Sequence, residues 1–219
     1  MIVNERMVTY INSLDRGNQG MLAEIEARAR QERVPIIRRE MQSFLKMLLA
    51  FKRPRRILEV GTAVGFSALL MAEHTSPDCR ITTIEKYEKR IPKARENFAA
   101  SPFGHKITLL EGDALEVLRQ LSGTYDFIFM DAAKGQYIHF LPETLRLLEP
   151  GGVMISDNVL QEGDIIESHY AVERRNRTIY RRMRDYLYQL THTEGLVTSV
   201  LPLGDGAAVT VKEEEREES

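Results

Sequence analysis

From residue 56 onward, short apolar runs alternate with amphipathic segments, and this alternation constrains the fold more than any other feature. Runs that are almost continuously apolar are typical of strands buried on both faces of a parallel sheet. The segments between them have the length and periodicity of crossover helices. The predicted strands are RILEV (56–60), RITTIE (80–85), KITLLEG (106–112), YDFIFMD (125–131) and GGVMISD (151–157). The predicted helices between them span 66–73, 88–99, 114–121 and 136–148.

The two ends of the chain have different patterns. Residues 1–50 favour helices, and Pro35 separates two of them. Near the other end, LVTSVLPLGDGAAVTVK (196–212) contains two β-runs around a Gly-Asp-Gly turn, which predicts an antiparallel hairpin. We therefore predict an α/β fold with a Rossmann-like, doubly wound, seven-stranded sheet that is mostly parallel and ends in this hairpin. It forms a single domain over residues 1–212, with a helical cap over 1–50.

Composition and charge exclude several classes of protein. Hydrophobic residues make up 43% of the 219 residues, but no apolar run reaches the ~18–20 residues of a membrane span. Charges near the N-terminus interrupt what would be the apolar core of a signal peptide, so we expect a cytoplasmic protein without membrane contact. The single cysteine, Cys79, excludes a disulfide within the chain and a Cys-based zinc site.

The net charge of −2 is unevenly distributed along the chain. The last seven residues, EEEREES (213–219), hold five Glu and one Arg and contribute −4, so residues 1–212 carry +2. A short run so rich in one charge is typical of a disordered, solvated tail. The rest of the chain is mildly basic, and its arginines are clustered.

The stretch LEVGTAVGFSALLMA (58–72) predicts a strand, a turn and a helix at the edge where α/β sheets bind ligands. Gly61 and Gly65 have the spacing G-x-x-x-G, which is neither the three-glycine dinucleotide fingerprint nor a P-loop. Glu85 ends the second strand, where it could accept hydrogen bonds from ribose hydroxyls or be a solvated strand-end acid. Asp113 and Ala114 follow the third strand and could flank an adenine, although Asp113 equally suits the N-cap of helix 114–121.

Two further acids, Asp131 and Asp157, end the fourth and fifth predicted strands, and Asn158 follows the second of them. Two carboxylates and an amide form an all-oxygen ligand set, which suits Mg²⁺ or Mn²⁺. Lys134, three residues after Asp131, is a candidate general base. The alternative for both acids is that they cap the helices that follow them.

Six segments together resemble the metal-dependent O-methyltransferase family, which includes the catechol and caffeoyl-coenzyme A O-methyltransferases. They are LEVGTAVGFSALLMA, TIEKYEKR, EGDALEVL, DFIFMDAAKGQY, GGVMISDNVL and LPLGDGAAVTVK. The resemblance covers about residues 35–212 and implies S-adenosylmethionine as the cofactor. The implied cofactor-binding residues are Ile37, Gly61, Ser67, Glu85, Asp113, Ala114 and Asp131. The implied metal ligands are Asp131, Asp157 and Asn158, with Lys134 as the catalytic base.

The stretch YAVERRNRTIYRRMRDYLYQL (170–190) predicts a helix with one apolar face and many arginines. Between residues 174 and 184 it has six arginines and no acid, which is either a phosphate-binding strip or an ordinary solvated face. The candidate RNA-binding residues are Arg174, Arg177, Arg181, Arg182 and Arg184.

Within the family, the sequence is most similar to the bacterial branch that methylates 5-hydroxyuridine at the wobble position of the tRNA anticodon loop. The expected partner is therefore tRNA, and the expected product is 5-methoxyuridine. One alternative is a small-molecule catechol or hydroxycinnamate O-methyltransferase. The alternatives of other classes are a nucleotide-binding oxidoreductase and a non-catalytic RNA-binding module. By analogy with relatives we expect a homodimer.

Overall fold

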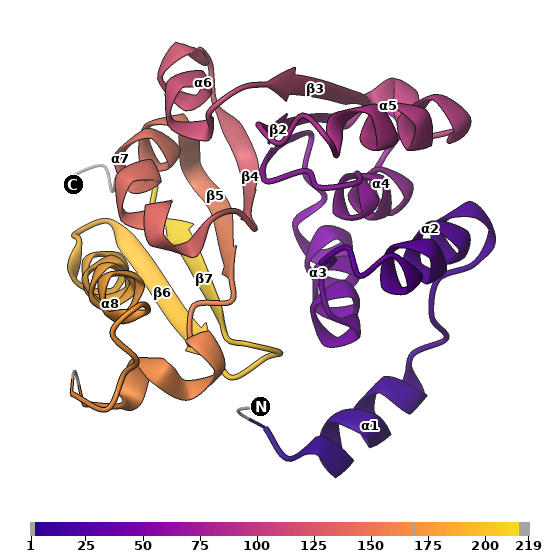
Figure 1. Cartoon of the computed structure of the whole chain (residues 1–219). Coiled ribbons are helices and arrows are strands. Elements are labelled where there is room, and N and C mark those ends of the chain that lie inside the picture. Colours follow the sequence, from indigo (N-terminus) through magenta and orange to yellow (C-terminus); the bar gives the residue numbers. More distant parts are fainter. Residues whose placement is uncertain (1–2, 169, 215–219) are drawn as a thin grey trace.

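A seven-stranded sheet runs through the molecule, with helices on both faces (Figure 1). The computed structural model describes residues 3–168 and 170–214. The strand order is β3-β2-β1-β4-β5-β7-β6; β7 runs antiparallel to β5 and β6, and the other neighbours are parallel. The strands are β1 Arg56–Val60, β2 Arg80–Glu85, β3 Ile107–Glu111, β4 Tyr125–Met130, β5 Leu148–Asp157, β6 Leu196–Leu201 and β7 Ala207–Lys212. The predicted fold class is confirmed.

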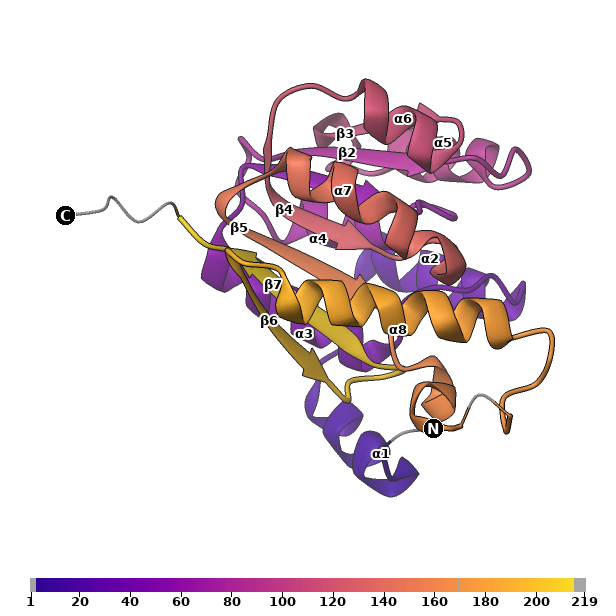
Figure 2. The same ribbon diagram turned by 90° about the vertical axis from the view of Figure 1, so that its left-hand side faces the viewer.

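Helices cover the two faces of the sheet in two groups. Along β1, Ile57 packs into the core shared with α2 to α5, while Leu58 packs into the core shared with α6 to α8. This alternation explains why the strand is apolar at consecutive positions. Figure 2 shows α7 and α8 in front of the sheet and α2 and α3 behind it. The helices are α1 Glu5–Leu14, α2 Gly20–Gln31, α3 Arg39–Lys52, α4 Phe66–Glu73, α5 Ile91–Ala100, α6 Ala114–Gln120, α7 Tyr137–Leu147 and α8 Arg177–His192.

Three short 3₁₀ turns complete the elements, and two of them adjoin the strand ends that carry the predicted site. They are η1 Gly104–Lys106, η2 Lys134–Gln136 and η3 Gln161–Ile166. Pro35 lies between α2 and α3, as predicted. Each helix within residues 3–168 and 170–214 is too short or too polar to cross a lipid bilayer.

The arginine-rich helix begins later than predicted. Residues 170–176 form turns, and α8 starts only at Arg177. The side chain of Arg177 donates a hydrogen bond to the main-chain oxygen of Val172 at 3.1 Å, and this contact holds the preceding turn against the helix start. Arg174 therefore precedes the helix. Ile179, an apolar residue of α8, is 36% exposed.

The described segments at the two ends of the chain differ in their contacts with the rest of the molecule. The amphipathic helix α1 buries none of its residues and projects from the rest of the molecule (Figure 1). At the other end, the amide of Glu213 donates to the main-chain oxygen of Gly195, so the acidic segment starts as a continuation of β7. The rest of the predicted tail, residues 215–219, lies outside the described residues.

Candidate active site

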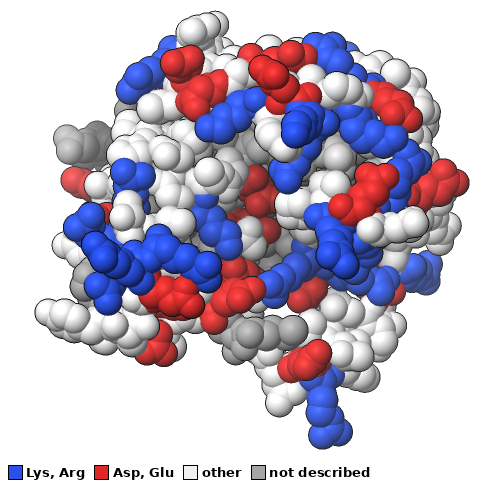
Figure 3. Space-filling view, viewed as in Figure 1, with Lys and Arg blue, Asp and Glu red and all other residues white. Residues whose placement is uncertain are grey.

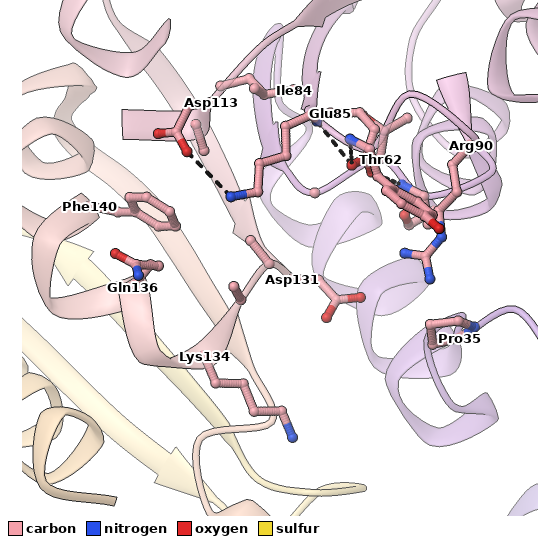
Figure 4. Close-up of a pocket in the computed structure, with 18 of the residues that line it drawn as sticks. Pro35, Thr62, Ile84, Glu85, Arg90, Asp113, Asp131, Lys134, Gln136 and Phe140 are labelled. Atoms are coloured by element: carbon pink, nitrogen blue, oxygen red, sulfur yellow. Dashed lines mark hydrogen bonds and ion pairs between the residues drawn. The ribbon is translucent and has the colours of Figure 1, made fainter. Parts of the chain in front are cut away.

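A cavity of about 540 Å³ opens at the carboxyl ends of β1, β2 and β4, and Figure 4 shows side chains from these strand ends around it. The parallel arrangement brings these ends to one edge of the sheet, where ligands bind in folds of this class. The cavity is lined by every predicted cofactor residue, namely Ile37, Gly61, Ser67, Glu85, Asp113, Ala114 and Asp131. Lys134 and Asn158 line it as well. Ile37 and Asn158, 121 positions apart in the sequence (158 − 37), are thus brought to one pocket.

The turn after β1 is tight because its glycine lies against the end of β4. Gly61 has a φ of 106°, in the region that favours glycine. A Cβ atom at this position would collide with the main-chain oxygen of Asp131. On the other side of the turn, the main-chain amide of Gly61 donates a hydrogen bond to the main-chain oxygen of Ile84 at 3.1 Å. Gly61 therefore allows the backbone of the turn to form one wall of the cavity.

Glu85 is buried rather than solvated, so the interpretation as an ordinary strand-end acid is wrong. Its carboxylate accepts hydrogen bonds from the main-chain amides of Ala63, Lys86 and Tyr87, at 2.7, 3.0 and 2.8 Å. These contacts tie the glycine turn after β1 to the end of β2. A carboxylate has about four acceptor positions, so Glu85 retains capacity for a ligand hydroxyl.

Asp113 caps a helix and also lines the cavity. Its side chain accepts from the amide of Leu115 at 3.0 Å, which makes it the N-cap of α6. It also lines the cavity and forms an ion pair with Lys86 at 3.4 Å (Figure 4). Capping therefore does not remove Asp113 from the site.

The two predicted carboxylate ligands lie side by side because β4 pairs with β5. Tyr137 fixes this arrangement: its buried hydroxyl lies 3.1 Å from the main-chain oxygens of both Met130 and Asp157, to which it donates. Burial raises the pKa of Asp131 to about 6, although the charge of Lys134 opposes the shift. Burial, and then the negative charge of Asp131, raise the pKa of Asp157 to about 7. Both carboxylates are thus poorly compensated in the protein alone.

The alternative that these two acids cap helices is wrong. Ala133 and Leu160 occupy the N-cap positions of η2 and η3. The Oδ1 atom of Asp157 instead accepts from the amide of the next residue, Asn158, at 2.7 Å. Asn158 has a φ of 59°, and its side chain lines the cavity beside that of Asp131.

Asp205, from the turn between β6 and β7, is a member of the site that the sequence did not identify. Its side chain is 3% exposed, and one carboxylate oxygen lies 3.0 Å from the ammonium of Lys134. The Gly-Asp-Gly motif was interpreted only as a hairpin turn. The antiparallel pairing of β7 with β5 carries this turn to the edge where β5 ends.

The predicted RNA-binding arginines lie outside the cavity and divide into two groups. Arg174 and Arg181 are exposed on the turn before α8 and on α8 itself. The other three donate hydrogen bonds to main-chain oxygens: Arg177 to Val172, Arg182 to Gly135 and Arg184 to Ile165. These three therefore also stabilise the segments around α8.

A sequence model of the O-methyltransferase family matches residues 13–213. The chain belongs to the O-methyltransferase family. This O-methyltransferase is 33% identical over 177 residues to a caffeoyl-CoA O-methyltransferase of Nicotiana tabacum, with 74% of this chain and 71% of the relative covered. It is 31% identical over 130 residues to a catechol O-methyltransferase of Niastella koreensis. That match spans 58% of this chain and 59% of the relative.

Solved structures agree with this assignment. The O-methyltransferase is similar to the S-adenosylhomocysteine-bound structure of a Podospora anserina methyltransferase, with a TM-score of 0.86, 27% identity and 97% of both chains covered. The predicted family and the predicted reaction class, S-adenosylmethionine-dependent O-methyl transfer, are confirmed. Membership favours methyl transfer over the oxidoreductase and the non-catalytic RNA-binding alternatives.

Proposed function

We propose that this O-methyltransferase uses a divalent cation, Mg²⁺ or Mn²⁺, to methylate one of two vicinal oxygens on its substrate. The observation that carries the proposal is the pair of carboxylates at adjacent strand ends, the partly buried Asp131, which lines the cavity, and the buried Asp157. Two buried like charges raise each other's free energy unless a cation compensates them. Asn158 contributes an amide oxygen next to them, and Mg²⁺ favours such all-oxygen ligand sets.

The donor set of two carboxylates and one amide oxygen suits a small, hard cation such as Mg²⁺ or Mn²⁺. Among the described residues, no group of three or more His, Cys, Asp and Glu side chains is arranged to hold an ion. We assign Asp131, Asp157 and Asn158 as the protein ligands, which would leave open positions for substrate oxygens. When bound, the cation would supply Lewis acidity toward the acceptor hydroxyl.

The same cavity fits S-adenosylmethionine, which would supply the methyl group. Glu85 would accept hydrogen bonds from the ribose hydroxyls, and Asp113 and Ala114 would flank the adenine. Gly61 and Ser67 would hold the methionine part. The backbone of Ile37, in the loop between α2 and α3, would close the site from the cap side.

Lys134 is the proposed proton acceptor, because it lines the cavity and its positive charge acts on both Asp131 and Asp157. To accept a proton, its Nζ atom must first be neutral. The positive charges of the cation and of the sulfonium would favour loss of that proton.

We propose 5-hydroxyuridine in the tRNA anticodon loop as the acceptor. Its 5-hydroxyl lies beside the O4 carbonyl, which gives two vicinal oxygens, and a wobble base lies in a single-stranded loop. The surface charge favours binding of an anionic polymer. Acidic side chains lie inside the central hollow, and basic side chains gather on both sides of its mouth (Figure 3). Arg174 and Arg181 are exposed on one side, and Arg38, 38% exposed, lies in the cap.

A catechol or a hydroxycinnamate is the second candidate acceptor, since the related enzymes from Niastella koreensis and Nicotiana tabacum are named for catechol and caffeoyl-CoA. Mass spectrometry of nucleosides from the tRNA of a deletion strain separates the two candidates. We expect 5-hydroxyuridine to accumulate and its methyl ether to disappear. Unchanged tRNA nucleosides, together with EDTA-sensitive methylation of catechol by the purified protein, would favour the small molecule instead.

A homodimer remains a prediction. The apolar side of α1 offers a surface for a second copy, because Tyr10 and Leu14 are 66% and 67% exposed. Analytical ultracentrifugation of the full chain and of a Tyr10→Ser/Leu14→Ser variant would test it. Two monomeric species would contradict the prediction.

A further inference from the structure

Asp205 holds two parts of the site that are far apart in the sequence. One carboxylate oxygen, Oδ2, pairs with the ammonium of Lys134 at 3.0 Å. The other, Oδ1, accepts a hydrogen bond from the main-chain amide of Glu162. The main chain of Asp205 adds a third contact, because its oxygen accepts from the amide of Leu160 at 3.0 Å. One buried residue thus joins η2, which carries Lys134, to the segment that follows Asn158.

That segment has an unusual backbone. Asn158, Gln161 and Glu162 all have positive φ, at 59°, 49° and 54°, and none of them is glycine. Such conformations cost about 1 kcal/mol or more each, and they persist only where surrounding contacts hold them. Asp205 supplies contacts at two of the amides in this segment. Gly206 supplies another, since its main-chain oxygen accepts from the amide of Val159 at 3.0 Å.

The ion pair also fixes where Lys134 lies. Lys134 lines both the 540 Å³ cavity and an adjoining cavity of about 360 Å³, and Asp205 lines the second. Lys134 therefore lies at the boundary between the proposed cofactor pocket and the adjoining 360 Å³ cavity. The side chain of Asp205 is 3% exposed, against 35% for Lys134, so the carboxylate is the fixed partner of the pair.

We infer that Asp205 is a positioning residue for methyl transfer. Its carboxylate holds the ammonium of Lys134 and the 158–162 segment in one arrangement, so that the proposed base and Asn158 keep fixed positions relative to each other. This inference rests on the proposed function. It assigns to the hairpin turn between β6 and β7 a role in catalysis that acts through Lys134, without contact to the reacting atoms.

The test compares two Asp→Asn changes. Asp205→Asn keeps the shape of the side chain and removes the charge that pairs with Lys134. Asp126→Asn is the matched control, because Asp126 also joins two segments by accepting from main-chain amides, those of Arg55 and Arg56, at the opposite end of the sheet. Methylation of 5-hydroxyuridine and of catechol is followed by release of S-adenosylhomocysteine. Loss of a residue that orients a metal ligand typically lowers activity about 10–100-fold, and we use the same range for a residue that orients the proposed base.

We expect Asp205→Asn to lower kcat in that range while the KM for S-adenosylmethionine is unchanged, and Asp126→Asn to leave kcat at the wild-type level. In a double variant with Lys134→Gln, Asp205→Asn should lower kcat little further, because each change alone already removes the same Lys134–Asp205 ion pair. Amide hydrogen exchange in residues 158–163 should become faster in Asp205→Asn and stay at the wild-type rate in Asp126→Asn.

The inference is overturned by wild-type kcat in Asp205→Asn, by multiplicative losses in the double variant, or by an equal loss in Asp126→Asn. Failure of the proposed function has a different signature, since wild-type protein would then methylate neither acceptor. In that case hydrogen exchange still decides the structural part, because unchanged exchange in residues 158–163 would show that Asp205 does not hold the segment.

Discussion

Replacement of Asp157 by asparagine should stabilise the metal-free protein, although it removes a proposed metal ligand. The side chain is 3% exposed, and burial together with the charge of Asp131 raises its pKa from 3.8 to about 7. The folded state therefore disfavours the ionised carboxylate. Asparagine has the same shape, can still accept from the amide of Asn158, and brings no charge next to Asp131.

The sign and size of the effect follow from linkage. A carboxylate whose pKa is raised by folding contributes stability below its unfolded pKa, and this contribution is lost as pH rises through the folded pKa. One pKa unit corresponds to ~1.4 kcal/mol. At pH 8 we expect Asp157→Asn to increase the free energy of unfolding by on the order of 2–4 kcal/mol. The gain should shrink toward pH 4, where Asp157 is protonated in most folded molecules.

Calorimetry in EDTA at pH 4, 6 and 8 measures this difference. For a domain of this size we expect the Tm to rise by about 5–15 °C at pH 8. Added Mg²⁺ should raise the Tm of the wild-type protein and leave that of the variant unchanged. Asp126→Asn is the control, and it should lower the Tm because it weakens contacts to two main-chain amides. A lower Tm for Asp157→Asn in EDTA at pH 8 would refute the electrostatic reasoning.

Three other changes test the remaining parts of the site. Gly61→Ala should destabilise the fold by about 2–4 kcal/mol, measured by urea unfolding, because the added Cβ collides with the main chain of Asp131; wild-type stability would contradict this packing. Glu85→Gln should weaken binding of S-adenosylhomocysteine about 10–100-fold in calorimetric titration, since hydrogen bonds to a charged acceptor contribute ~1.5–3 kcal/mol; equal affinity would remove Glu85 from the cofactor site. Arg174→Ala/Arg181→Ala should weaken tRNA binding and reduce its salt dependence, with methylation of free 5-hydroxyuridine unchanged; equal losses on both substrates would indicate a folding defect.

Much of the fold could be predicted because burial on both sides of a parallel sheet leaves a clear pattern. β1 and β2 begin and end at the predicted residues, and the strand-end positions of Glu85, Asp131 and Asp157 follow directly. Their convergence on one cavity also follows, since parallel strands end at one edge. The start of α8 could not be predicted, because the turn that replaces its first residues depends on a side-chain contact of Arg177.

Asp205 could not be assigned to the site for a different reason. Its partner Lys134 lies 71 residues away in the sequence, and their contact depends on how the C-terminal hairpin packs against β5. Hydrophobic alternation predicts a hairpin but does not give its position in the sheet. The Gly-Asp-Gly sequence is sufficient to explain a turn, so nothing local indicated a second role.

Tertiary contacts also change how the arginine-rich segment can be tested. Arg182 and Arg181 are adjacent in the sequence, but Arg182 donates a hydrogen bond at 3.0 Å to the main-chain oxygen of Gly135, which follows Lys134 in η2. Loss of Arg182 would therefore disturb the proposed base as well as the surface charge. A variant that includes it could not separate RNA binding from catalysis, because free nucleoside and tRNA would both be affected. Arg174 and Arg181 are exposed, so their replacement by alanine mainly changes the surface charge, and a loss restricted to tRNA can be attributed to binding of the polymer.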